Sequence, residues 1–464
     1  MKSYPDTLAE EFLARPQKIH IIGVGGAGMS AIGQVLLAMG HEVTGSDLKM
    51  SAALERLEAL GATTYVGHDA DQLGEAEVVA ISTAIPERNS ELAAARERGL
   101  VVLRRKQMLA AIAGQRKTLA VGGTHGKTTT SSMIALVLRR AGLKPSFIIG
   151  GDVNEIGTGA AWADGEWFVV EADESDGTFI ELPRDAAIVT NIEPDHIEHY
   201  GGFDGLLDAF GVFVSAATGP VVVCADDDIA REIGARHDAV TYGVHPDATY
   251  RMVDVAGGRE GISFSIVHLG ERLGQVDLPV PGLHNATNAA GAIAVCMELG
   301  APFSAGMAAM STYGGVARRF ERRGETGGVT FIDDYAHLPT EVEAALQAAA
   351  DGEWNRVVCV FQPHRYSRTA SLWDTFGDSF DVADLLVVTD IYSAGETPRP
   401  GVSGKLIVDA VLDSRPWSRL AFMPHHGELV DYLASELSEG DLCLTLGAGD
   451  LTDLPDELIA RMGV

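Results

Sequence analysis

The segment AVGGTHGKTTTSSM (residues 120–133) combines glycines, one lysine and a run of threonines ahead of an apolar stretch. In such a segment we expect Lys127 to contact the β- and γ-phosphates of a nucleotide and the Thr128 hydroxyl to bind Mg²⁺. The pattern departs from the strict G-x-x-x-x-G-K-T form, because Val121 stands at the first glycine position and Gly122 follows it. The Gly-Lys-Thr core is intact, so the segment predicts a phosphate-binding turn; a strand-to-helix turn without a nucleotide is the structural alternative.

Two acidic clusters follow apolar runs and are candidates for holding the metal. The run WFVVE ends at Glu171, and His196 lies shortly after the run AAIVT. Further polar residues in these clusters are Asp173, Glu174, Asp176, Asn191 and Asp195. Ligands in open α/β sheets bind at the carboxyl ends of strands, so we expect both clusters at the same edge as Lys127. Oxygen ligands with one imidazole favour Mg²⁺ or Mn²⁺ over zinc.

An earlier glycine-rich turn has the pattern Gly23-x-Gly25-x-x-Gly28 and follows the apolar run KIHII. Asp47 ends the next apolar run about 20 residues later, where an acid that binds ribose is expected. The glycines allow backbone N–H groups to approach a diphosphate at the positive end of a helix. From the residues alone the usual interpretation is NAD binding, and a tight turn without ligand is the alternative.

A third group of polar segments follows apolar runs near the carboxyl terminus: FIDDYAH, FQPHRYSRT, TDIYSAGE and LGAGD. The formal net charge of −30 means that an anionic ligand must be attracted by local cationic groups. The basic clusters here contain Arg318, Arg319, His364, Arg365 and Arg368. We therefore expect a binding face for an anionic ligand in this region.

The elements that position these residues alternate short Val/Ile/Leu-rich runs with helical stretches, as in parallel sheets covered by helices. At 464 residues the chain fits about three domains. We expect three α/β domains: a Rossmann-like one at 1–112, a P-loop ATPase-like one at 113–314 with a small antiparallel sheet near 250–282, and a Rossmann-like one at 315–464.

Composition excludes several classes of protein. The acidic surface implied by 65 Asp and Glu against 35 Lys and Arg would repel nucleic acid and anionic membranes. The sequence lacks an apolar secretory leader and any run long enough for a membrane helix, which predicts a cytoplasmic protein. Four scattered cysteines without a CxxC pair predict buried thiols in a reducing compartment.

Taken in order, the segments GVGGAGMSAIG, GGTHGKTTTSSM, VEADESDGTF, TNIEPDHIEHYG, PGLHNATNAAGA, RRFE, DDYAHLPTEV and FQPHRYSRT resemble the Mur ligase family, from about Ile19 to Asp450. The resemblance is strongest to members that add L-alanine. It implies ATP-dependent joining of L-alanine to the lactyl carboxylate of UDP-N-acetylmuramate through an acyl phosphate, with Mg²⁺ or Mn²⁺, for peptidoglycan synthesis. It also replaces NAD at the first turn by the UDP of the sugar.

The resemblance further implies a set of site residues. UDP-sugar contacts are Gly23, Gly25, Gly26, Gly28, Met29, Ser30, Asp47, Ser82 and Thr83. ATP contacts are Gly123, Thr124, His125, Gly126, Lys127, Thr128, Thr129, His284, Asn285, Asn288, Arg319 and Asp334. The amino-acid side comprises Tyr335, His337, His364, Arg365 and Arg368, and the metal ligands are Thr128, Glu171 and His196. Lys127, His196, Arg319 and His337 are the implied catalytic residues.

The chain departs from the family pattern in two ways. Leu338 stands where relatives often have a second histidine, and Ala336 where they have glycine. No lysine occurs between Lys144 and Lys405, so the carbamylated lysine of later pathway ligases is absent there. The alternatives are a recycling ligase that adds a tripeptide, an NAD-dependent dehydrogenase and a non-catalytic UDP-sugar sensor. Monomer and dimer both stay open.

Overall fold

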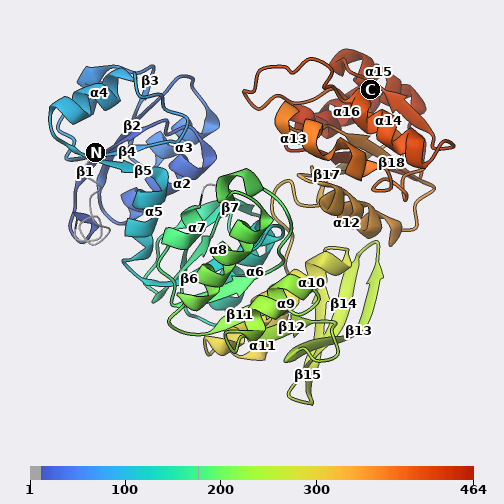
Figure 1. The fold of residues 1–464 in the computed structure, drawn as a ribbon, viewed down its shortest axis with the longest axis horizontal. Coiled ribbons are helices and arrows are strands. Elements are labelled where there is room, and N and C mark those ends of the chain that lie inside the picture. Colours follow the sequence, from blue (N-terminus) through green and yellow to red (C-terminus); the bar gives the residue numbers. More distant parts are fainter. Residues whose placement is uncertain (1–11, 176, 464) are drawn as a thin grey trace. The chain divides into compact units, whose positions relative to one another are not determined.

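The computed structural model describes residues 12–175 and 177–463. They form three sheets (Figure 1). By their contacts the residues divide into two compact units: one comprises the described chain up to Val253 with Ser265–Val276 and Thr287–Ser311, and the other comprises Asp254–Phe264, Asp277–Ala286 and the described chain from Thr312. The mixed α/β class predicted from the alternating runs is confirmed.

The first sheet has five parallel strands in the order β3-β2-β1-β4-β5, which is the order of a dinucleotide-binding half with strands added on both sides of β1. Its strands are β1 (Lys18–Ile22), β2 (Glu42–Asp47), β3 (Thr63–Val66), β4 (Val78–Ile81) and β5 (Val101–Arg104). The connecting helices are α2 (Ala27–Ala38), α3 (Ala52–Ala59), α4 (Ser90–Glu97) and α5 (Arg105–Ala113).

The second sheet has ten strands in the order β15-β14-β13-β12-β11-β10-β6-β9-β7-β8. The central strands are β6 (Lys117–Gly122), β9 (Trp167–Glu171), β10 (Ala186–Val189), β11 (Val221–Cys224) and β12 (Val240–Gly243), and β7 (Ser146–Val153) and β8 (Thr158–Ala161) form one edge. Its principal helices are α6 (Lys127–Arg140), α8 (Phe203–Ser215), α9 (Asp228–Ala235), α10 (Leu283–Glu298) and α11 (Phe303–Met310).

The predicted antiparallel excursion consists of β13 (Tyr250–Gly258), β14 (Gly261–His268) and β15 (Glu271–Leu278). Two-residue connections reverse the chain between these strands, so they run antiparallel. They extend the large sheet rather than form a sheet of their own, because Tyr250 at the start of β13 pairs with Tyr242 of β12.

The third sheet has the order β16-β17-β21-β18-β19-β20. β16 (Glu321–Thr326) is antiparallel to β17 (Val329–Asp334), and the parallel strands are β17, β18 (Arg356–Phe361), β19 (Leu385–Val388), β20 (Leu420–Phe422) and β21 (Asp441–Leu446). Its helices are α12 (Pro339–Ala350), α13 (Tyr366–Leu372), α14 (Lys405–Ser414), α15 (His426–Glu436) and α16 (Leu454–Met462).

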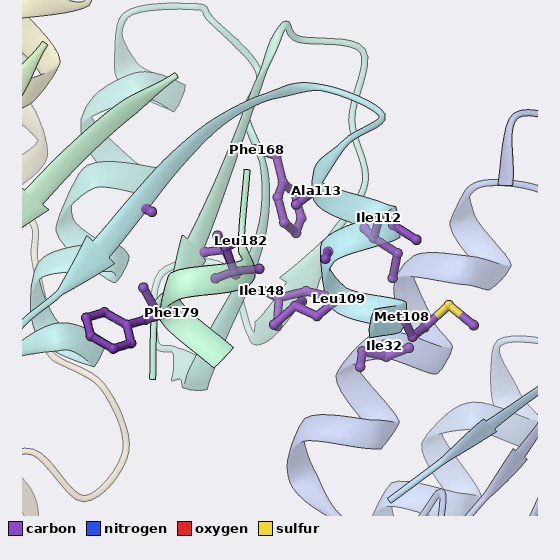
Figure 2. Packing of buried hydrophobic residues seen from close by; sticks show 14 of the residues in the cluster. Ile32, Met108, Leu109, Ile112, Ala113, Ile148, Phe168, Phe179 and Leu182 are labelled. Carbon is purple, nitrogen blue, oxygen red and sulfur yellow. The ribbon is translucent and has the colours of Figure 1, made fainter. Parts of the chain in front are cut away.

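Helix α5 links the cores of the first and second sheets. Its first turn is polar (Arg105–Gln107), whereas the residues Met108 to Ala113 form a continuous apolar run and are all buried. Figure 2 shows Met108 next to Ile32 of α2, Leu109 next to Ile148 of β7, and Ala113 next to Phe168 of β9. One hydrophobic core therefore joins the glycine-rich turn after β1 to the strands that carry the Gly-Lys-Thr turn.

The four cysteines are buried and free, as predicted. Burial raises the pKa of the Cys224 thiol to about 11 and that of Cys443 to about 12. Among the residues that the structure describes, none of the helices combines the length and the apolar character needed to cross a bilayer.

Candidate functional site

The first glycine-rich turn is held by the end of β2. The carbonyl of Ser46 accepts hydrogen bonds from Gly23 N (2.8 Å) and Val24 N (3.1 Å), and Asp47 Oδ2 accepts one from Gly25 N (2.8 Å). The turn requires glycine: Gly23 has φ of +81°, and a Cβ on Gly25 would lie 2.8 Å from Asp47 Oδ2. Asp47, predicted to bind ribose, therefore also braces the turn through one carboxylate oxygen.

The other residues predicted to contact the UDP-sugar differ in exposure. Ser82 lies beside the turn, because a Cβ on Gly23 would come within 2.9 Å of Ser82 Cβ, and Thr83 is exposed. The side chain of Met29 belongs to the core, and the Ser30 hydroxyl donates to the Ala27 carbonyl (3.0 Å). Met29 and Ser30 thus position the first turn of α2.

The second turn follows β6 and starts α6. Gly126 is the N-cap of α6 with φ of +77°, and Gly123 has φ of +132°. Asn191, which follows β10, braces the turn: its Oδ1 accepts from His125 N (2.8 Å), and its backbone carbonyl accepts from Thr124 N (2.9 Å). From the sequence alone, Asn191 is only a polar residue near the end of a predicted strand, and this bracing contact is not predictable.

Lys127 is held inside this turn. Its Nζ donates to the carbonyls of Gly123 (2.6 Å) and Thr124 (3.0 Å) and to Glu174 Oε2 (2.8 Å). Burial alone would lower the pKa of Lys127, but the nearby carboxylates, of which Glu174 is the strongest, raise it above its usual value. Glu174 is 2% exposed, and its pairing with Lys127 is a contact that the acidic run ADESD did not reveal.

Glu171 lies beside the start of α6, at the end of β9. Its Oε2 accepts a hydrogen bond from Thr128 Oγ1 (3.2 Å), and its Oε1 accepts from Gly150 N (2.6 Å) and Ser131 Oγ (3.3 Å). The strands β10, β6 and β9 are parallel neighbours, so their carboxyl ends meet at one edge as predicted. Thr129 is buried in the same first turn of α6.

Of the three residues predicted to hold a metal, Thr128 and Glu171 lie in contact with each other. Mg²⁺ commonly binds one or two carboxylates together with phosphate oxygens and water, and Thr128 with Glu171 fits that donor set. His196 follows β10 with φ of +51°, and its Nε2 lies 3.4 Å from Asp195 Oδ2. Within residues 12–175 and 177–463 no three His, Cys, Asp or Glu side chains form a metal-binding group. Asp176 lies outside the described residues.

Helix α10 carries the residues expected near adenine. Asn288 lies against the Gly-Lys-Thr turn, since a Cβ on Gly126 would come within 2.7 Å of Asn288 Oδ1. In the other unit, Asn285 Nδ2 donates to the Pro281 carbonyl (2.7 Å), and burial lowers the pKa of His284 to about 4. The imidazole of His284 is therefore neutral at neutral pH.

In the second unit, the Asp334 carboxylate connects the backbone at Phe320 with the backbone at Ala336. Its Oδ2 accepts from Phe320 N and its Oδ1 from Ala336 N, both at 2.7 Å. The guanidinium of Arg319 lies 5.0 Å from the centre of the Tyr335 ring, a cation–π contact. Burial raises the pKa of Asp334 to about 6, although Arg319 and the two backbone donors oppose this shift.

This raised pKa predicts a pH dependence. Because folded Asp334 holds its proton up to about pH 6, its contribution to stability is present below the unfolded pKa near 4 and is lost as the pH rises towards about 6. The free energy of unfolding of the wild type minus that of Asp334→Asn should therefore fall between about pH 4 and 6 and become constant above about pH 7. Urea titrations across this range measure it; a difference that rises with pH would contradict the assigned shift.

The residues predicted for the amino-acid side come together. The rings of His337 and His364 lie 5.5 Å apart, and His364 stacks on Tyr392 at 5.7 Å. Arg368 Nη1 donates to His364 Nδ1 (3.1 Å). Burial, with His337 and the neighbouring arginines, lowers the pKa of His364 to about 3, so His364 is a neutral acceptor.

Two further contacts complete this cluster. His337 N donates to Glu341 Oε2 (2.9 Å), and Arg365, exposed and at φ of +68°, donates its N–H to the Tyr392 carbonyl (2.8 Å). Tyr392 and Glu341 were not predicted as site residues; TDIYSAGE was recognised only as a polar strand end. The cluster joins imidazole, phenol and guanidinium groups, which can bind and orient an anion and an amine.

Three family models match the chain: "Mur ligase family, catalytic domain" at residues 18–117, "Mur ligase middle domain" at 121–296 and "Mur ligase, glutamate ligase domain" at 318–449. Together with the fold and the glycine-lysine turn, these matches show that the chain belongs to the Mur ligase family.

Similar proteins include two named UDP-N-acetylmuramate–L-alanine ligase. The protein from Pelotomaculum thermopropionicum is 45% identical over 97% of this chain and 98% of its own length, and that from Rubrobacter xylanophilus is 43% identical over 96% and 100%. A crystal structure of UDP-N-acetylmuramate–alanine ligase from Thermotoga maritima matches with a TM-score of 0.82, 30% identity and coverage of 96% and 99%.

Proposed function

We propose that this protein joins L-alanine to the lactyl carboxylate of UDP-N-acetylmuramate, converting ATP to ADP and phosphate. The single observation that carries this proposal is the similarity, along nearly the full length, to proteins named for that reaction. The brace around Lys127 and the paired Thr128 and Glu171 support the use of ATP. We also propose that the chain has three domains, at residues 1–112, 113–314 and 315–464.

The chemistry requires activation, because the carboxylate would otherwise have to lose an oxide ion. A carboxylate oxygen attacks the γ-phosphorus of ATP and ADP leaves, which gives an acyl phosphate. The neutral amine of L-alanine then attacks the acyl carbon, the carbon–oxygen bond breaks, and inorganic phosphate leaves. Lys127 stabilises the charge on the transferring phosphoryl group, and Arg319 is proposed for the same role.

The remaining residues are proposed to bind and orient the substrates. The first glycine-rich turn with Asp47 and Ser82 holds UDP, and the cluster around His337 and His364 orients the amino acid. Thr128, Glu171 and His196 would hold Mg²⁺ or Mn²⁺, which supplies positive charge to the phosphate oxygens. His196 and His337 are both candidates to accept the amine proton.

The test is to incubate the protein with UDP-N-acetylmuramate, ATP, Mg²⁺ and single amino acids or the tripeptide, and to weigh the product while measuring ADP. We expect product with L-alanine. Product with the tripeptide alone would identify the recycling ligase instead. Saturable NADH binding, followed by fluorescence, would favour the dehydrogenase, and absence of turnover with any acceptor would favour the sensor.

A further inference from the structure

A fully buried carboxylate lies at the centre of a polar cluster under the first sheet. Glu91 of α4 has no exposed surface, and neither has His20 of β1. Glu91 Oε1 lies 3.2 Å from His20 Nε2, while Glu91 Oε2 lies 2.8 Å from His68 Nδ1 and accepts a 2.7 Å hydrogen bond from Ser46 Oγ. Thr44 Oγ1, in turn, lies 2.7 Å from His20 Nδ1.

This arrangement uses both oxygens of Glu91 as acceptors. An ionised carboxylate has only acceptor sites, and here it faces one hydroxyl and two imidazole nitrogens. The burial of an ionised group is costly unless its partners are in place, so each partner is held tightly. Glu91 therefore fixes three separate segments: β1, the end of β2 and the connection after β3.

Ser46 connects this cluster to the glycine-rich turn. Its side chain donates to Glu91, and its backbone carbonyl accepts from Gly23 N and Val24 N. Ser46 pairs with Ile22, the residue directly before the turn, and the next residue, Asp47, holds Gly25. A shift of Ser46 would displace three of the amides that shape the turn.

We propose that Glu91 is a positioning residue for UDP-sugar binding: through Ser46 it sets the geometry of the glycine-rich turn that receives the diphosphate. The inference rests on the proposed function. Glu91 does not touch the substrate in this proposal; its effect passes through one hydroxyl to the turn.

Glu91→Gln is the sharpest test, because it keeps the volume of the side chain but turns an NH₂ group towards donors at one of the two oxygen positions. We expect KM for UDP-N-acetylmuramate to rise on the order of 10-fold, with kcat and KM for ATP and L-alanine nearly unchanged. Calorimetry should show a matching loss of UDP affinity. Ser46→Ala should act in the same direction, and the two changes together should be less than additive.

Asp441→Asn is the matched control. Asp441 is another buried carboxylate (1% exposed), which accepts from Arg356 at 2.6 Å and from Ser438 N at 2.9 Å, in the third sheet. It should lower the thermal midpoint without changing KM for the UDP-sugar. If Glu91→Gln also lowered only the thermal midpoint, Glu91 would be merely structural and the inference wrong. If the wild type neither bound nor consumed UDP-N-acetylmuramate, the proposed function would fail instead.

Discussion

Lys127→Ala is expected to reduce the rate of ADP formation by on the order of 10³-fold while UDP-sugar affinity stays unchanged. The ammonium lies inside the turn that precedes α6, where it meets two carbonyls and Glu174. No other lysine and no arginine occurs in that turn. The measurement is a coupled assay for ADP, with calorimetry for the UDP-sugar.

The substitution also leaves Glu174 buried without its partner, which costs stability by itself. The double variant Lys127→Ala/Glu174→Gln removes the carboxylate charge and separates the two effects. It should regain stability but not turnover. Lys117→Ala is the matched control, because Lys117 lies on β6 in an exposed ion pair with Glu166, and it should keep full activity. Near-normal turnover of a folded Lys127→Ala protein would refute the role of Lys127.

Gly123→Ala is expected to lower the free energy of unfolding by about 3 kcal/mol or more and to abolish turnover. The φ of Gly123 is +132°, and a Cβ there would lie 2.0 Å from Thr190 Oγ1 and 3.0 Å from Thr190 N. The hydroxyl cannot move freely, because it donates to the His125 carbonyl within the same turn. The added methyl group must therefore displace the turn or β10.

The control variant Gly142→Ala measures the cost of a positive φ without a steric collision. Gly142 also has a positive φ, +77°, but a Cβ there would meet nothing within 4 Å. The Gly142→Ala variant should lower the free energy of unfolding by about 1–2 kcal/mol, with turnover preserved. Urea unfolding of both variants gives the comparison, and an equal loss at the two positions would mean that the contact with Thr190 is unimportant.

Much of the fold was predictable because the buried parallel strands are nearly continuous apolar runs. KIHII became β1 and WFVVE became β9. β7 was missed, since Gly150 and Gly151 interrupt its apolar pattern. The antiparallel excursion was predicted correctly in direction, but the pairing of Tyr250 with Tyr242, which attaches it to the large sheet, carries no local signal.

The candidate site also has features that were predictable from the sequence and others that were not. Local spacing was enough to predict a glycine-rich turn between a strand and a helix at the Gly-Lys-Thr core, and the structure has this turn between β6 and α6. The partners of that turn were not predictable: Glu174 lies 47 residues from Lys127, and Asn191 lies 66 residues from His125. The same holds for Glu91, which meets Ser46 across 45 residues.

By itself, the amino-acid sequence determined the alternation of strands and helices, both glycine-rich turns and the membership of a ligase family. Only the tertiary structure decided which carboxylate meets which donor. The reason is that hydrophobic periodicity is a local property, whereas contacts between strand ends depend on the order in which strands enter a sheet. The order β10-β6-β9 brings Asn191 and Glu171 to opposite sides of the Lys127 turn, and no pattern along the chain specifies that order.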